Sequence, residues 1–257
     1  MNALRKVAVG GFIPVLVIAG YWVWATMSRN PYFPNPMRIM ERFQKLWLFA
    51  KLPTDVVPSL TNFALGYVIA VFSGVIAGVV LGRIKLLRQL FAPLLDFARS
   101  IPAIMLIPPF VLLLGIGDQS KVAIIALGAF FPVVLATMDG LRRTDPALID
   151  VTRSMQLSRW QELLVAWVPS AGPQIAGGMQ TGLQFAFILM VASEMLAATH
   201  GLGYLTMQAQ FTFDSASVWA GILMLAILGF GLNTLFVLAR NRVLRWHIQS
   251  RATARAR

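Results

Sequence analysis

The sequence has 257 residues, of which 58% are hydrophobic and only 12% are charged, and its formal net charge is +12. Its mean hydropathy of +0.72 and its low charge content exclude an ordinary soluble globular protein, in which about 25% of residues are charged. The absence of cysteine excludes a disulfide framework, a thiolate metal site and a thiol nucleophile. The composition therefore indicates an integral membrane protein.

Six apolar stretches approach or exceed the roughly 20 residues that a helix needs to cross a bilayer. They predict an all-α membrane protein, a single transmembrane domain over residues 1–257. The six predicted transmembrane helices lie at residues 9–27, 60–82, 97–117, 121–139, 172–197 and 217–240. The first stretch begins like a signal peptide, but its length and the interface-suited residues Tyr21, Trp22 and Trp24 favour an uncleaved helix.

Small residues and prolines indicate how two of these spans pack. The second span carries a small residue at every fourth position, namely Gly66, Ala70, Gly74, Gly78 and Gly82. Because such a stripe lets a neighbouring backbone approach closely, we expect this helix to pack against protein. The third span is interrupted by proline at positions 102, 108 and 109. Freed carbonyl groups are tolerated only inside protein or beside a water-filled cavity, so this span is expected near a pathway or an interface.

The positive charges are distributed unequally between the two sides of the membrane. Fifteen Lys and Arg residues lie at the two chain ends, between spans two and three and within residues 140–169, whereas six lie in the other connections. The positive-inside rule then places both termini and residues 140–169 in the cytoplasm. Residues 30–55 fall outside, where an amphipathic pattern after three prolines predicts a short interfacial helix that acts as a clamp. The charge therefore indicates topology and attraction to anionic lipid rather than nucleic-acid binding.

The chain carries no convincing catalytic or metal-binding motif. It has no GxxxxGK[ST] phosphate loop, so an ATPase that drives it must be a separate chain. Residues 115–118 match the GxGD pattern of intramembrane aspartyl proteases, but Asp118 and the other candidate, Asp96, are predicted near opposite faces, which favours a helix-ending turn. His200 and His247 are also predicted on opposite sides, so no metal site is expected.

Three polar residues of the fifth span fall within an arc of roughly 80° on one helical face. They are Gln180, Gln184 and Glu194. Polar and ionisable side chains are costly inside a membrane and usually face a bundle interior or an aqueous cavity. We therefore expect them to line a translocation path, with buried hydrogen bonds that fix helix packing as the alternative.

The polar segment 140–169 is the strongest candidate for a functional surface. Leu148, Val151 and Met155 share one helical face by their spacing. A second face is shared by Leu157, Trp160, Leu164 and Trp167. A merely solvated loop would not need such faces, so the pattern predicts two short amphipathic helices that dock a partner. A helix lying on lipid is the alternative.

This segment resembles the cytoplasmic loop of the membrane subunits of bacterial binding-protein-dependent ABC importers. That loop runs EAA, three residues, Gly, nine residues, then Ile, one residue, Leu and Pro. Here Asp150, Val151 and Thr152 occupy the EAA positions, and Gln156 and Pro169 occupy those of the glycine and the proline. Three further stretches are similar, in order and spacing, to the nitrate, sulfonate and taurine permease branch: residues 101–121, 157–183 and 191–205.

The resemblance implies the type I ABC importer transmembrane fold in a bacterial inner membrane. Its implied partners are a second copy of this chain, two cytoplasmic ATP-binding subunits that hold ATP and Mg, and an extracytoplasmic solute-binding protein; this chain itself is expected to bind no cofactor. It also implies a set of ATPase-coupling residues: Asp150, Val151, Thr152, Ser154, Met155, Gln156, Leu157 and Arg159. Since Gln156 replaces glycine, we expect a right-handed turn or a geometry that differs from the family's.

The sequence thus predicts a non-enzymatic permease subunit of an ATP-driven importer for a small solute. An anion of the taurine, alkanesulfonate or nitrate class is preferred, delivered by the binding protein. An ion-coupled secondary transporter would instead use Glu194 as an ion site, but it predicts inverted repeats that the sequence does not convincingly show. A non-transporting membrane scaffold is the third alternative and rests only on the docking surface.

Overall fold

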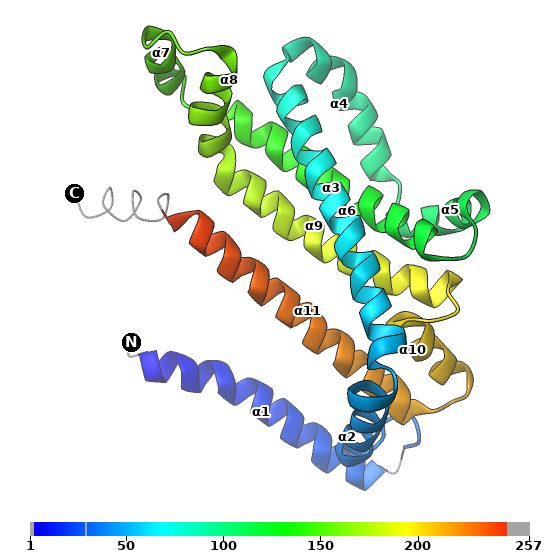
Figure 1. The fold of residues 1–257 in the computed structure, drawn as a ribbon. Helices are drawn as coiled ribbons and strands as arrows, with labels where there is room; N and C mark the ends of the chain where they lie inside the picture. Colours follow the sequence, from blue (N-terminus) through cyan, green and yellow to red (C-terminus); the bar gives the residue numbers. More distant parts are fainter. Residues whose placement is uncertain (1–2, 29, 246–257) are drawn as a thin grey trace.

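The structure, a computed structural model, describes residues 3–28 and 30–245, and every regular element in these ranges is helical (Figure 1). The α-helices are α1 (Ala3–Ser28), α2 (Pro36–Phe43), α3 (Val57–Arg83), α4 (Lys85–Ser100), α5 (Ile107–Leu114), α6 (Asp118–Arg142), α7 (Pro146–Ser154), α8 (Arg159–Glu162), α9 (Val168–Ala197), α10 (Leu202–Phe211) and α11 (Ser215–Val243). Shorter helical turns of π or 3-10 type occupy Gln44–Ala50, Leu52–Val56, Ala103–Leu106 and Leu163–Trp167.

Within the described ranges, four continuous helices are long and apolar enough to cross a membrane: Leu52–Arg83, Asp118–Arg142, Arg159–Ala197 and Ser215–Val243. The expected third span, residues 97–117, is not one helix, because α4 and the Ala103–Leu114 segment meet at 86°. The break follows from proline chemistry, since Ile101 precedes Pro102 and is forced into an extended conformation with ψ at 122°. This bent pair is either a fifth crossing or a re-entrant segment.

The centre of the bundle is α6, which packs against α3 on one side and α9 on the other (Figure 1). The small-residue stripe of α3 is buried against α6, as its spacing predicts. A Cβ atom added at Gly78 would lie 2.8 Å from the Val134 carbonyl oxygen, and one added at Gly66 would lie 2.9 Å from that of Val122. Small residues of α9 make equally close approaches from the other side, because a Cβ at Gly182 would lie 3.0 Å from the Ala129 carbonyl oxygen.

The predicted interfacial segment forms α2, whose first turn is capped by the Asn35 side chain. Its apolar side meets protein: Ile39 and Phe43 pack against the main core, and Trp47, in the π-helical turn that follows, is buried. Arg42 of α2 lies 3.4 Å from Asp214, at the start of α11. These contacts join the segment to the main core and to the start of α11.

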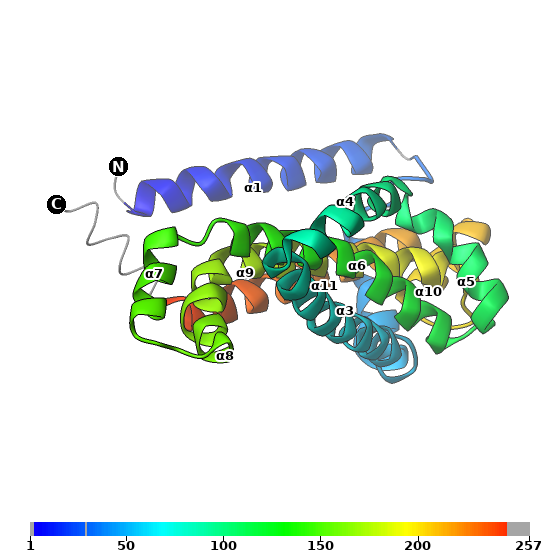
Figure 2. The same ribbon diagram turned by 90° about the horizontal axis from the view of Figure 1, so that it is seen from above.

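The first helix, α1, meets the rest of the described chain near its C-terminal end. There the Tyr21 hydroxyl donates to the Pro34 carbonyl oxygen at 2.9 Å, and Trp24 packs edge-on against Phe33. Trp219 of α11 completes this aromatic cluster. The body of α1 stands apart from the other helices in both views (Figures 1 and 2), as expected for a helix that faces lipid or another chain.

Candidate functional site

The segment between α6 and α9 lies at one end of the long helices, with α7 and α8 side by side (Figures 1 and 2). We call residues 145–167 the α7–α8 lobe. Helix α7 begins at Pro146 because proline suits the first helical position and the preceding Asp145 accepts a hydrogen bond from the Ala147 N–H at 2.9 Å. The lobe is therefore a folded structure with its own capping signals.

Gln156 ends α7 in a left-handed conformation, with φ at 54°. The Gln156 N–H donates to the Arg153 carbonyl at 2.9 Å, and the Leu157 N–H donates to the Thr152 carbonyl at 3.2 Å. This pair of bonds defines a Schellman turn, which normally uses glycine because other residues pay roughly 1–2 kcal/mol for positive φ. Of the two alternatives expected from the sequence, the right-handed turn is wrong. The chain makes the turn that glycine favours, and the two bonds offset its cost.

Substitutions at Gln156 test this turn. We expect Gln156→Gly to raise the free energy of unfolding by up to about 1 kcal/mol and Gln156→Val to lower it by about 1 kcal/mol or more, because glycine tolerates positive φ and a β-branched residue does not. Thermal unfolding in detergent measures both changes. At Gln89, exposed within helical α4, glycine should instead destabilise by about 1 kcal/mol. Glycine effects of the same sign at both positions would contradict the assignment.

The second predicted helix of the lobe is the first turn of a much longer one. Ser158 and Gln161 form a reciprocal capping box at its start, and the helix then runs without a break over Arg159–Ala197, 39 residues. It tolerates Pro169 because the preceding turn, Leu163–Trp167, widens to a π-helix. The lobe is thus rigidly continuous with a membrane-spanning helix.

The predicted apolar face of α7 points away from the rest of the chain. Leu148, Val151 and Met155 are 39%, 55% and 67% exposed, whereas Ile149 and Thr152 on the opposite face are buried. Three apolar side chains in a row on a polar lobe form a small unpartnered stripe. Such exposed patches mark interaction sites.

The second apolar set of the lobe is divided between surface and interior. Trp160 and Leu164 are exposed, whereas Leu157 and Trp167 are half-buried. Trp167 has a structural role, because its indole N–H donates to a Glu162 carboxylate oxygen at 2.7 Å. Only part of this predicted face is therefore available to a partner.

Arg83, at the end of α3, anchors the lobe and was not singled out from the sequence. Its guanidinium donates to the Arg159 carbonyl at 3.0 Å, lies 3.6 Å from the Glu162 carboxylate and stacks 5.8 Å above the Trp167 ring. The sequence gives no signal for this contact, because Arg83 is far from Arg159 and Glu162 along the chain and resembles any basic residue at a helix end. It ties α3 to the start of the long helix.

The other predicted coupling residues lie on the same lobe. The Asp150 side chain is 75% exposed and lies 3.8 Å from Arg153, and the Ser154 hydroxyl donates to the Asp150 carbonyl at 2.9 Å. Arg159 is exposed beside the start of α8. The lobe thus presents mixed charges around the stripe of Leu148, Val151 and Met155.

Of the three polar residues predicted for a translocation path, Gln180 and Gln184 lie together beside α11 and Glu194 lies apart. Gln180 of α9 donates to Asn233 of α11 at 3.0 Å and accepts from the Arg240 guanidinium at 2.6 Å. Gln184 lines a cavity of about 370 Å³ between α9 and α11, which Asn233 also lines. Glu194 lies about 21 Å farther along the helix axis than Gln180. Asn233 and Arg240 lie on another helix, so spacing within the fifth span gave no signal for them.

Glu194 belongs to a buried network that caps the start of α10. The N–H groups of Gly201, Leu202 and Gly203 donate to Asp55 at 2.9 Å, Ser59 at 3.2 Å and Glu194 at 2.9 Å, respectively. Ser59 also donates to the other oxygen of Glu194. All three capping side chains are buried. Because the first N–H groups of a helix lack internal partners, this arrangement supports the packing alternative for Glu194 over a place in the path.

Substitution of Glu194 separates these two roles. We expect Glu194→Leu to lower the free energy of unfolding by about 1–3 kcal/mol for each donor left unpaired, and Glu194→Gln to lower it less. Solute uptake per folded molecule should be unchanged in the glutamine variant, which is measured by normalising uptake to folded protein. A selective loss of uptake at unchanged stability would instead place Glu194 in the path.

The structure separates the two aspartates of the protease-like GxGD pattern and shows no metal site among the described residues. Asp118 begins α6, where Asn62 donates to it at 2.7 Å and Lys121 at 3.2 Å, while Asp96 lies on α4 beside Arg99. In the described part of the chain, no group of three or more His, Asp or Glu side chains is placed to hold a metal. His247 and the basic residues that follow it lie outside the described residues.

Comparisons with known proteins identify transport permeases as relatives of this chain. A putative aliphatic sulfonates transport permease protein (SsuC) of Bacillus subtilis is 29% identical over 92% of this chain and 87% of its own length. The taurine transport system permease protein (TauC) of Escherichia coli is 30% identical over 92% of this chain and 88% of its own length. A probable ABC transporter permease protein of Brucella melitensis is 31% identical over 88% of this chain and 92% of its own length. These relatives are described as permeases rather than enzymes.

Solved structures share the fold. The MetNI methionine ABC transporter in an inward-facing conformation contains a chain that matches 74% of this one and 93% of its own length, with a TM-score of 0.60 and 23% sequence identity. The family model of the binding-protein-dependent transport system inner membrane component matches residues 70–245. This chain therefore belongs to the family of inner membrane components of binding-protein-dependent transport systems.

Proposed function

We propose that this chain is one half of a homodimeric pathway for solute import, driven by two ATPase chains that bind the α7–α8 lobe. Membership of the family implies an ATPase and a solute-binding protein as partners. One observation carries the assignment of the lobe: its exposed stripe of Leu148, Val151 and Met155 stands on a structure that continues unbroken into α9. The stripe offers the apolar contact, and the helix offers a rigid connection into the membrane.

Coupling requires the ATPases to favour one conformation of the pathway over another, since a ligand shifts an equilibrium only by its differential affinity. Because Arg159–Ala197 is one continuous helix, a displacement of α8 by the ATPase would move Gln180 and Gln184 as well. Arg83 joins α3 to the same movement through Glu162. Rigid elements with two arrangements are the physical basis of such coupling.

The proposed orientation places both termini and the α7–α8 lobe in the cytoplasm and residues 30–55 outside. It is supported by the fifteen basic residues assigned to the cytoplasmic side against six assigned to the other. ATP and Mg belong to the ATPase chains in this proposal, and this chain binds no cofactor. The extracytoplasmic binding protein would dock near the outer ends of α3, α6 and α11.

The proposed solute is a small anion of the alkanesulfonate and taurine class. The support comes from the names of two relatives and from the Arg240 guanidinium beside Gln180 on the α9–α11 face, which gives that region a positive charge. Glu194 does not oppose an anion there, because its carboxylate is buried in the network at the start of α10. Nitrate is the nearest alternative substrate.

Uptake into proteoliposomes tests this proposal. The chain is reconstituted with its partner ATPase and binding protein, and uptake of labelled taurine or an alkanesulfonate is followed. We expect uptake that requires enclosed ATP and the binding protein and that excess nitrate inhibits weakly. Uptake driven by an ion gradient without the ATPase would overturn the proposal in favour of a secondary carrier, and an absence of uptake with an intact complex would favour a scaffold.

A further inference from the structure

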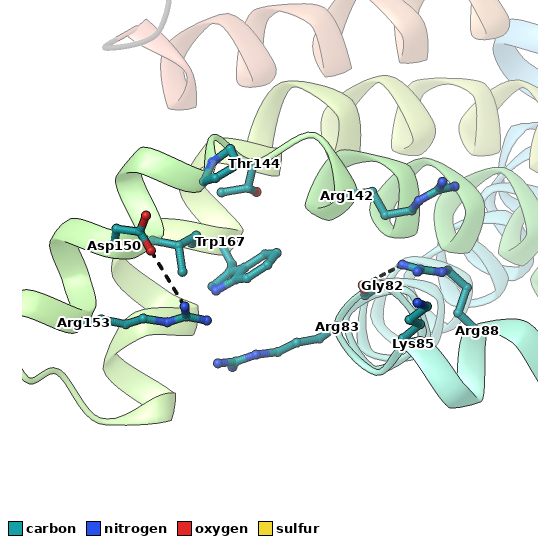
Figure 3. A pocket seen from close by; sticks show the side chains of 11 residues that line it. Gly82, Arg83, Lys85, Arg88, Arg142, Thr144, Asp150, Arg153 and Trp167 are labelled. Carbon is teal, nitrogen blue, oxygen red and sulfur yellow. Dashed lines mark hydrogen bonds and ion pairs between the residues drawn. The ribbon is translucent and has the colours of Figure 1, made fainter.

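A strongly basic cavity of about 460 Å³ lies where α3 passes into α4, facing the end of α6 and the start of α7. Figure 3 shows basic side chains from both sides pointing toward this hollow. Its cationic members come from four helices, α3, α4, α6 and α7: Arg83, Lys85, Arg88, Arg142 and Arg153. The cavity falls within the range of roughly 300–1,000 Å³ that is usual for small-molecule sites.

The charges that line this cavity are not balanced by its own acids. Of the five cationic side chains, Arg83 lies 3.6 Å from Glu162 and Arg142 lies 3.5 Å from Asp139. With Asp150, which lines the cavity, three carboxylates offset five cations, so the net charge around the cavity is about +2. Asp150 is shared with Arg153 at 3.8 Å. Among the described residues Lys85 has no ion-pair partner, and Arg88 donates only to the Gly82 carbonyl, at 3.4 Å. An anion entering the cavity would therefore meet free positive charge.

The cavity is also lined by a neutral hydrogen-bond donor, the Thr144 hydroxyl. The Thr144 hydroxyl oxygen is buried and has no hydrogen-bond partner among the described residues, although Thr144 lines the cavity. Buried polar groups are normally paired, so an unpaired hydroxyl in a cavity that Lys85 and Arg88 also line favours a ligand that can accept hydrogen bonds. A phosphate oxygen meets both requirements, because it accepts from guanidinium, ammonium and hydroxyl groups alike.

The surface beside the cavity is apolar, which distinguishes a lipid from a soluble phosphate. Helix α4 begins with Lys85 at the cavity, and its exposed side carries Leu86, Leu90, Leu94 and Phe97 at helical spacing. These residues are between 57% and 69% exposed. A molecule whose phosphate occupies the cavity would lay acyl chains along this face. Basic pockets at the cytoplasmic ends of membrane helices are suited to such headgroups.

We propose that this cavity binds the phosphate of an anionic phospholipid from the cytoplasmic leaflet, with the acyl chains against α4. The site rests on the orientation proposed above. Because its walls include Arg83, Asp150 and Arg153, its occupant would contact both the α7–α8 lobe and the α3–α4 junction. A bound headgroup would fix the lobe against the bundle, so lipid charge would tune the coupling of transport.

Thermal unfolding of the full-length chain in detergent, with added lipid, tests this site. We expect phosphatidylglycerol to raise the melting temperature and phosphatidylcholine to leave it unchanged. In the double variant Lys85→Gln, Arg88→Gln, about 30-fold more phosphatidylglycerol should be needed, since two cations at the site are lost. The matched variant Arg38→Gln, Lys45→Gln removes two exposed cations from residues 30–55 and should respond like the unmodified chain.

Three outcomes would overturn the proposal: an equal response to phosphatidylcholine, an unchanged response in the Lys85, Arg88 variant, or the full response with inorganic phosphate alone. The last would make the site one for a soluble phosphate. The exchanged pair Lys85→Arg, Arg88→Lys retains both charges and should retain the response, which separates loss of charge from misfolding. No ATPase or solute is present, so failure of the proposed import function leaves this readout unaffected.

Discussion

Replacing Val151 by glutamate is expected to reduce binding-protein-stimulated ATP hydrolysis by the assembled transporter more than tenfold while leaving the chain folded. Val151 is 55% exposed at the centre of the outward stripe of α7, so a charge there is solvated in the free chain. In the proposed complex it would be buried without a partner, which costs several kcal/mol, and 1.4 kcal/mol already corresponds to a factor of ten. ATPase assays in proteoliposomes measure the effect.

The control for this substitution uses the same position. Val151→Ile keeps the apolar character and the helical position of the side chain, so stimulated hydrolysis should be retained. A melting temperature unchanged in both variants would show that the contrast arises at the interface. If Val151→Glu supports normal stimulated turnover, the stripe does not contact the ATPase.

The second large effect is expected at Gly78, where α3 and α6 touch. A Cβ atom there would lie 2.8 Å from the Val134 carbonyl oxygen and against the Thr137 side chain. Because that oxygen belongs to the backbone, the two helices must separate to admit a side chain, and overpacking of this kind costs typically 1–3 kcal/mol or more. We expect Gly78→Leu to abolish accumulation of folded protein in the membrane, measured by size-exclusion chromatography of the detergent extract.

Gly20 provides the matched position for this experiment. It lies in α1 and has no atom within 4 Å of an added Cβ. The same substitution, Gly20→Leu, should leave the yield of folded protein unchanged, because the added side chain meets open space. A similar loss in both variants would show that hydrophobic bulk, rather than the α3–α6 contact, determines the yield.

The sequence predicted those parts of the fold that depend on local periodicity. Small residues at every fourth position, ending at Gly78 and Gly82, define one face of α3. In the structure that face is buried against α6. The outward stripe around Val151 was predicted for the same reason, since spacing within α7 places its residues on one side. Periodicity is a property of a single helix, so it can be recognised without knowing which helices pack against it.

Features that depend on contacts between distant segments were not predictable in this way. Arg83 and Glu162 are 79 positions apart, and Gln180 meets Arg240 only because α9 and α11 lie together. The position of Glu194 was ambiguous because the angle around one helix does not say which neighbour it meets. Gln156 shows a further limit of prediction from residue type. Glutamine favours a right-handed conformation, but the two hydrogen bonds of the Schellman turn stabilise the left-handed one.

The central claim, that the α7–α8 lobe is the contact surface for the ATPase, is tested most directly by site-specific cross-linking. The chain contains no cysteine, so Val151→Cys supplies a single thiol on the outward stripe, and Leu112→Cys supplies one on α5, where the native leucine is 87% exposed. A thiol-to-amine reagent should join the ATPase to the first variant and not to the second. Cross-linking at Leu112 but not at Val151, in an intact complex, would contradict the account.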